Sequence, residues 1–262
     1  MIPFISPILF HIPVWHRPVH AFGVLVALGI LIGVPQVVRR GKQLGLDPLV
    51  VSTMCTWAIG IGFIVSHLFD VIAYQPEALQ RNPLALIDIT GGLSSFGGFA
   101  GALATLAILA RKHKLPLLAA CDASVFGGTV GWLFGRLGCF TAHDHPGIET
   151  TLFFGVNFGS HPPYGIRHDL GLYEAFYTLL LVLAFQLMAR HPRPVGRYAM
   201  IVGLTYGPIR FALDFLRISD EKYFGLTPGQ YGSVVLFVVG LVLLAKSPDR
   251  PLSPASQNQQ PE

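Results

Sequence analysis

The chain has 262 residues, of which 52% are hydrophobic and only 12% are charged. Soluble domains average about 25% charged residues. This composition, with a mean hydropathy of +0.56, therefore excludes an ordinary soluble domain and indicates a multi-pass membrane protein. The net charge of +4 gives no sign of nucleic-acid binding. The three cysteines are scattered and odd in number, which argues against a disulfide framework.

Seven apolar stretches are each long enough to cross a bilayer, which takes about 20 residues in an α-helix. We expect an all-α fold with a single transmembrane domain over residues 1–246. The Pro-rich first 19 residues are expected to lie along the membrane surface, and the Pro/Ser/Gln-rich residues 247–262 to form a disordered cytoplasmic tail. The predicted spans cover residues 20–38, 50–74, 85–110, 117–140, 170–189, 198–216 and 230–246.

The basic residues predict the orientation of these spans. Eleven Lys and Arg residues fall on one side of the membrane, and five fall on the other. Cytoplasmic loops carry the excess of Lys and Arg, so we expect the C-terminus in the cytoplasm and the N-terminus outside. The eleven are Arg39, Arg40, Lys42, Arg111, Lys112, Lys114, Arg190, Arg193, Arg197, Lys246 and Arg250.

In this orientation the ionisable residues of the spans gather in the outer half of the membrane. Arg210, Asp214 and Arg217 share one helix face in YGPIRFALDFLR (206–217). Charge at membrane depth is costly, and where it persists it lines a site or an ion pathway. Two simpler interpretations are snorkelling to lipid headgroups and an ion pair that satisfies itself. Because several segments converge at one depth, we infer a polar cavity open to headgroups.

Two of these charges suit a phosphate. Arg136 ends a span within GRLGCFTAHDHPG (135–147), and Arg210 lies in the sixth span. A planar guanidinium donates bidentate hydrogen bonds to phosphate oxygens. The Gly-rich GGLSSFGG (91–98) lacks the pattern of a nucleotide-binding loop, so we expect its glycines to allow a broken or closely packed helix.

The residues after Arg136 form a compact titratable cluster of His143, Asp144 and His145. A His with a free pKa of about 6.5 suits proton transfer, so acid/base work is one interpretation. Together with Cys139 the cluster also holds ordinary zinc ligands, but its spacing matches no standard zinc motif. We therefore expect no metal ion and no cofactor. A solvated external turn is the third interpretation.

Taken in order, these segments resemble the prolipoprotein diacylglyceryl transferase family. Members of that family move the diacylglyceryl group of phosphatidylglycerol onto the thiol of a lipobox cysteine in a preprolipoprotein and release glycerol phosphate. The reaction takes place at the outer face of the bacterial plasma membrane. The motifs that carry the resemblance are GGLSSFGG (91–98), GRLGCF (135–140), LYEAFY (172–177) and YGPIRFALDFLR (206–217).

The resemblance implies a multi-pass enzyme of the plasma (inner) membrane, a monomer, with phosphatidylglycerol, preprolipoprotein signal peptides and membrane lipids as partners. It implies that Arg136 and Arg210 hold the lipid phosphate and stabilise the leaving charge. Asp214 replaces the family's usual Glu and would position Arg210. The residues expected to bind substrate are Gly92, Ser94, Gly138, Gly147, Tyr173, Glu174, Asp214 and Arg217.

The chain departs from the family pattern at the residues that would handle protons. Phe96 stands where the family has a functionally important His, and Cys139 stands where it has an Asn. A phenyl ring cannot accept a proton. We hypothesise that the base is relocated to residues 143–145, so that the catalytic set is Arg136, His143, Asp144, His145 and Arg210.

Two other functions remain open at this point. A related phospholipid-dependent transferase could use another acceptor, and a non-catalytic membrane protein could bind lipid or transport a solute. A transporter typically has polar residues at the midplane and internal repeat symmetry. The inner halves of these spans are apolar and no repeat is evident, so a transporter is the least favoured.

Overall fold

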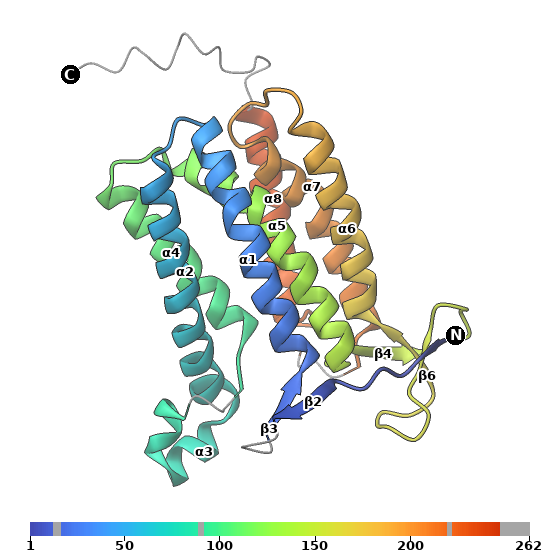
Figure 1. The fold of residues 1–262 in the computed structure, drawn as a ribbon. Helices are drawn as coiled ribbons and strands as arrows, with labels where there is room; N and C mark the ends of the chain where they lie inside the picture. The colour runs from blue at the N-terminus through green and yellow to red at the C-terminus, as the bar shows by residue number, and fades with distance from the viewer. Residues whose placement is uncertain (13–16, 89–91, 219–221, 247–262) are drawn as a thin grey trace, which may run out of the picture. The chain divides into compact units, whose positions relative to one another are not determined.

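A computed structural model describes residues 1–12, 17–88, 92–218 and 222–246, so the predicted tail lies outside the described residues. Within these ranges six helices are long and apolar enough to cross a membrane, which confirms a polytopic all-α membrane protein (Figure 1). They are α1 (Ala21–Gln43), α2 (Pro48–Phe69), α5 (Leu117–Ala142), α6 (Leu170–Met188), α7 (Arg197–Leu213) and α8 (Pro228–Lys246).

The third predicted span differs from the helix that forms there. A 3₁₀ helix covers Pro83–Ile87, and α4 (Ser95–Lys112) begins only after the extended backbone of Ser94. The predicted start at residue 85 is therefore wrong. α4 has 18 residues and ends on two cations, and it is not among the six helices that are long and apolar enough to cross a membrane. The count of seven spans stays a prediction.

The chain forms two compact units. Residues 37–123 make up one unit, in which α4 packs on α2 through glycines. A Cβ atom on Gly97 would lie only 2.6 Å from the carbonyl oxygen of Val65. α2 continues into a π-helix (Asp70–Tyr74) and the short α3 (Pro76–Arg81). Within the same unit Arg40 and Asp122 form a buried ion pair of 3.0 Å.

The other unit, residues 1–36 and 124–262, contains strands that the sequence did not predict. A four-stranded sheet has the order β1–β5–β6–β4, in which β1 and β5 are parallel and the other pairs antiparallel. Its strands β4 and β6 join the ends of α5 and α6 (Figure 1). The strands are β1 (Ile2–Pro3), β4 (Pro146–Glu149), β5 (Val156–Asn157) and β6 (Ile166–Asp169), with a separate hairpin of β2 (Ile8–Ile12) and β3 (Arg17–His20).

Glycines at the helix crossings of this unit allow the backbones to pack closely. On α1, a Cβ atom at Gly33 would lie 3.0 Å from the carbonyl oxygen of Gly127 on α5. On α7, a Cβ atom at Gly203 would lie 2.7 Å from the Cα atom of Gly240 on α8. Small residues at such crossings let backbones approach in membrane proteins, where helix association depends on packing. The backbones of α7 and α8 thereby lie close enough for side chains of one helix to contact the other.

An aromatic cluster packs the first turn of α7 against α5 and the last turns of α6. The Tyr198 ring lies 4.9 Å from that of Phe126 and 4.7 Å from that of Phe185. All three side chains are buried, and aromatic pairs in this range add about 1 kcal/mol each beyond their buried area. With this cluster fixed, the late turns of α5 and α7 and the first turns of α6 converge.

Candidate functional site

A single buried carboxylate joins three helices of the larger unit. Glu174, near the start of α6, is fully buried, and its Oε2 atom lies 3.1 Å from Arg136 Nε of α5. Its Oε1 atom lies 3.4 Å from Arg210 Nη1 of α7. The Tyr206 hydroxyl also donates to Oε2. Glu174 therefore holds two guanidinium groups side by side, although they lie more than 70 residues apart in the chain.

A second buried carboxylate extends this arrangement. Asp214 Oδ1 lies 2.8 Å from Arg210 Nη1 and 3.9 Å from Arg217 Nη1, and the Thr227 hydroxyl donates to Oδ2. A Cβ atom at Gly229 would lie 2.7 Å from Asp214 Oδ2. The Arg210–Asp214 contact read from the sequence is present, but Arg210 is shared with Glu174. The pair is thus part of a network that spans helices.

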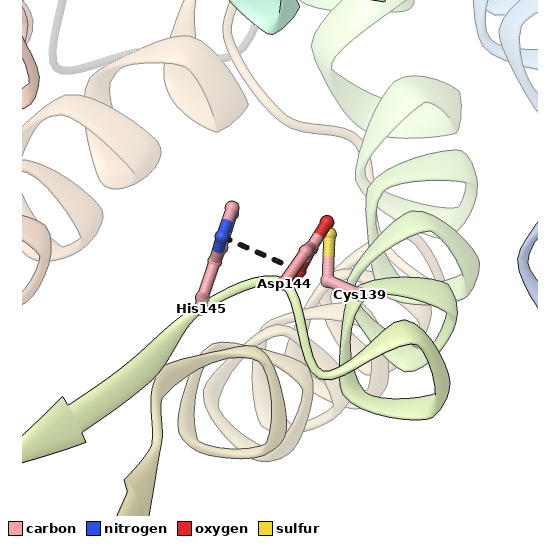
Figure 2. A group of neighbouring side chains, drawn as sticks. All are labelled: Cys139, Asp144 and His145. Atoms are coloured by element: carbon pink, nitrogen blue, oxygen red, sulfur yellow. Dashed lines mark ion pairs between the residues drawn. The ribbon is translucent and has the colours of Figure 1, made fainter. Parts of the chain in front are cut away.

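The loop after α5 completes the network. Arg217 Nη2 lies 3.2 Å from His145 Nδ1, which lies 3.3 Å from Asp144 Oδ1. Arg136 Nη1 lies 4.0 Å from the Cys139 sulfur. The Cys139, Asp144 and His145 side chains face one another above the end of α5 (Figure 2).

The environment moves the pKa values of both loop residues. Burial raises the pKa of Asp144, because it disfavours the charged carboxylate, while the positive charge of Arg136 opposes the change. Burial and the neighbouring Arg217 lower the pKa of His145 to about 3. His145 is therefore neutral at pH 7, and its Nδ1 can accept a hydrogen bond from Arg217.

His143 has different partners from the rest of the predicted cluster. Its Nε2 accepts the backbone N–H of Ile5 at 3.3 Å, so Nδ1 carries the proton and donates to Asp169 Oδ2 at 3.0 Å. The ring also stacks on Phe4 at 4.3 Å. With both nitrogens engaged, His143 anchors the N-terminal segment to the start of α6. Of residues 143–145, the structure brings Asp144 and His145 to the arginines.

The other predicted residues of this unit lie around the network as packing contacts. A Cβ atom at Gly138 would lie 2.8 Å from the Phe22 ring, and one at Gly147 would lie 2.9 Å from the carbonyl oxygen of Leu216. Gly147 also forms a bridge with Arg217, which ties the loop to the end of α7. The Tyr173 hydroxyl bonds His168 Nδ1 at 2.7 Å.

Gly92 and Ser94 belong to the smaller unit. A Cβ atom at Gly92 would lie 2.4 Å from Asp70 Oδ2, so only glycine fits there without rearrangement. The Ser94 carbonyl accepts a hydrogen bond of 2.7 Å from the Ser66 hydroxyl. The side chain of Phe96 lies outside the described residues. Whether this unit contacts substrate stays a prediction.

Three contributors to the network were not predicted from the sequence. Tyr206 lies one turn before Arg210, and Trp132 lies one turn before Arg136, with the Arg136 guanidinium 4.2 Å from its ring centroid. Helical spacing from each arginine could have identified both. Thr227 precedes α8 and has the sequence pattern of an ordinary helix cap. Only the fold shows that its hydroxyl donates a hydrogen bond to Asp214.

Fold and site together define a polytopic membrane protein in which three arginines, held by buried carboxylates, gather where helix ends meet. The family model of prolipoprotein diacylglyceryl transferase matches residues 7–246. The chain therefore belongs to this family of enzymes, as the resemblance predicted.

Curated relatives support the assignment along most of the chain. The phosphatidylglycerol–prolipoprotein diacylglyceryl transferase of Solidesulfovibrio magneticus is 32% identical over 90% of this chain and 91% of its own length. That of Nitratidesulfovibrio vulgaris is 30% identical over 97% and 95%, respectively. That of Anaplasma marginale is 28% identical over 92% and 87%.

The role of His143 can be tested by His143→Phe. This change keeps an aromatic ring on Phe4 but removes both hydrogen bonds, leaving the buried Asp169 carboxylate short of a donor. We expect a loss of about 1–3 kcal/mol in the free energy of unfolding, measured by denaturation in detergent. His191→Phe, at an exposed loop position, is the control. Unchanged stability together with lost transferase activity would instead assign His143 to catalysis.

Proposed function

We propose that this chain transfers the diacylglyceryl group of phosphatidylglycerol to the thiol of a prolipoprotein cysteine, the two substrates that its relatives' names specify. The observation that carries the proposal is the pair of guanidinium groups on Glu174. The planar guanidinium group donates two parallel hydrogen bonds that match a pair of phosphate oxygens. Arg136 and Arg210 supply two such groups, already oriented by one carboxylate.

The charge change in the reaction explains why several arginines gather here. The phosphodiester of the lipid carries one negative charge, and the phosphate monoester that leaves carries up to two at pH 7. Donors aimed at this growing charge stabilise the transition state more than the ground state. Arg210 and Arg217 keep 12% and 14% of their side-chain surfaces exposed, so an incoming phosphate can reach them.

The acceptor cysteine must react as a thiolate, because the thiol is a poor nucleophile. We assign its activation to Asp144 and His145, which lie beside the arginines, and not to His143, whose ring nitrogens are both engaged. Asp144 is the more exposed of the two side chains. A prolipoprotein signal peptide would thus present its cysteine at the loop between α5 and β4, to a single copy of this chain.

We further propose that the enzyme lies in the bacterial plasma membrane with this site at the outer face. Within the larger unit, Glu174 lies near the start of α6 and Arg210 near the end of α7, whereas Arg190 and Arg193 follow α6 and Arg197 begins α7. The basic residues mark the cytoplasmic side, so the site lies at the opposite ends of these helices. A C-terminal green fluorescent protein fusion should fluoresce, and a C-terminal alkaline phosphatase fusion should be inactive, because the C-terminus lies in the cytoplasm. The reverse pattern would overturn the orientation.

The activity can be tested with purified protein, phosphatidylglycerol and a lipobox peptide, by following glycerol phosphate release and the peptide mass. We expect Arg136→Lys and Arg210→Lys each to lower kcat/KM by about 30-fold, since each loses a bidentate charged contact worth about 2 kcal/mol. Arg111→Lys, at the exposed end of α4, is the control.

The outcomes separate the proposed transferase from the other candidates. Glycerol phosphate release without a change in peptide mass would assign a different acceptor. No release by the wild-type protein would assign a non-catalytic lipid-binding role. Full activity in both Lys variants would contradict the phosphate site.

A further inference from the structure

Three side chains with different donor atoms meet at the end of α5. The Cys139 sulfur, an Asp144 carboxylate oxygen and a His145 ring nitrogen all lie within 4.8 Å of one another (Figure 2). Cys139 comes from the last turns of the helix, and the other two come from the loop that follows. Between them His143 adopts a positive φ of 52° and is tied to Asp169, which turns the loop back over the helix end.

We propose that Cys139, Asp144 and His145 bind one Zn²⁺ ion, whose fourth coordination position takes the acceptor thiol. Thiolate, carboxylate and imidazole are the ordinary zinc ligands, and three protein ligands with an open fourth position are typical of catalytic zinc. Zinc–ligand bonds of about 2.0–2.3 Å place tetrahedral ligands about 3.5 Å apart. The cluster would therefore contract by about 1 Å. The identity of the fourth ligand rests on the proposed function.

The nearby arginines would repel a cation unless its charge were neutralised. The Cys139 thiolate and the Asp144 carboxylate together carry two negative charges, which offset those of Zn²⁺. The loaded protein site is then neutral, and Arg136 and Arg210 keep their charge for the phosphate. His145 Nδ1 faces Asp144 at 3.3 Å, so an ion bound there would take the place of the Arg217 contact. Arg217 would then be released toward the lipid.

Asp144 and His145 would then activate the acceptor as zinc ligands, because a metal-bound thiol loses its proton outright. The proton passes to water, and the bound sulfur attacks the glyceryl carbon that carries the phosphate ester. The C–S bond forms as the C–O bond breaks, and the bonding electron pair leaves on the phosphate oxygen. Glycerol phosphate departs between the arginines. The step needs no external oxidant or reductant.

The site can be tested without any turnover by titrating the purified full-length protein with Co²⁺. A thiolate ligand gives a charge-transfer absorption band, which we expect to saturate at one equivalent and to be displaced by Zn²⁺. Cys139→Ser should remove the band, and Asp144→Asn should weaken Co²⁺ binding at least about tenfold. Cys55→Ser and Cys121→Ser, at the other two free cysteines, should retain it. No band in the folded wild-type protein, or an unchanged band in Cys139→Ser, would overturn the site.

A lipobox peptide then tests the open position. A peptide with its cysteine should intensify the Co²⁺ band by adding a second thiolate, whereas a matched serine peptide should not. No change with the cysteine peptide would overturn the role in thiol activation.

The metal site and the proposed function can fail separately. Full thioether formation by protein freed of metal with a chelator would overturn the zinc role and leave the transferase function intact. Co²⁺ binding without thioether formation from phosphatidylglycerol would support the metal site and contradict the transferase function.

Discussion

The fully buried Glu174 carboxylate is the interaction on which the site depends. Arg136 and Arg210 come from different helices, and their like charges would repel each other in an apolar interior without it. Removing one member of a buried ion pair leaves an uncompensated charge and is strongly destabilising. Asp214 has the same role for a second pair of guanidinium groups, those of Arg210 and Arg217. The carboxylates thereby fix the directions of the guanidinium groups before any lipid arrives, which is the condition for electrostatic stabilisation of a transition state.

The helix packing serves this convergence. The glycine contacts between α7 and α8 leave no room for a side chain. The missing side chain at Gly229 likewise lets Asp214 and Arg210 lie against the α8 backbone. A small sheet links the ends of α5 and α6, and His143 ties the N-terminal segment to the start of α6. The loop with Asp144 and His145 is therefore held from both sides. The loop to which we assign thiol activation is irregular, and regular helices support it.

Much of this could be predicted from the sequence, where the signal was local. Hydropathy gave the membrane-length helices, and helical spacing placed Arg210 and Asp214 in contact. The missing parts depend on contacts between distant residues. No local pattern reveals that Glu174 bridges two other helices, or that the backbone N–H of Ile5 occupies His143 and makes it an anchor. The strands have two to five residues each and lack an alternating pattern long enough to detect. The start of α4 was misplaced because hydropathy does not register the extended backbone at Ser94.

The central claim is that Glu174 prepares the arginines for the phosphate and does not merely neutralise them. The Glu174→Gln variant distinguishes these two roles. It preserves the shape of the side chain and the hydrogen-bond acceptor for Tyr206 but removes the charge. If the carboxylate only competed with the lipid, its removal would strengthen phosphate binding. We predict the opposite, a fall in kcat/KM for phosphatidylglycerol of about 10- to 100-fold, with Glu149→Gln in the exposed sheet as the control. Activity in Glu174→Gln equal to or above that of the wild-type protein would contradict the account.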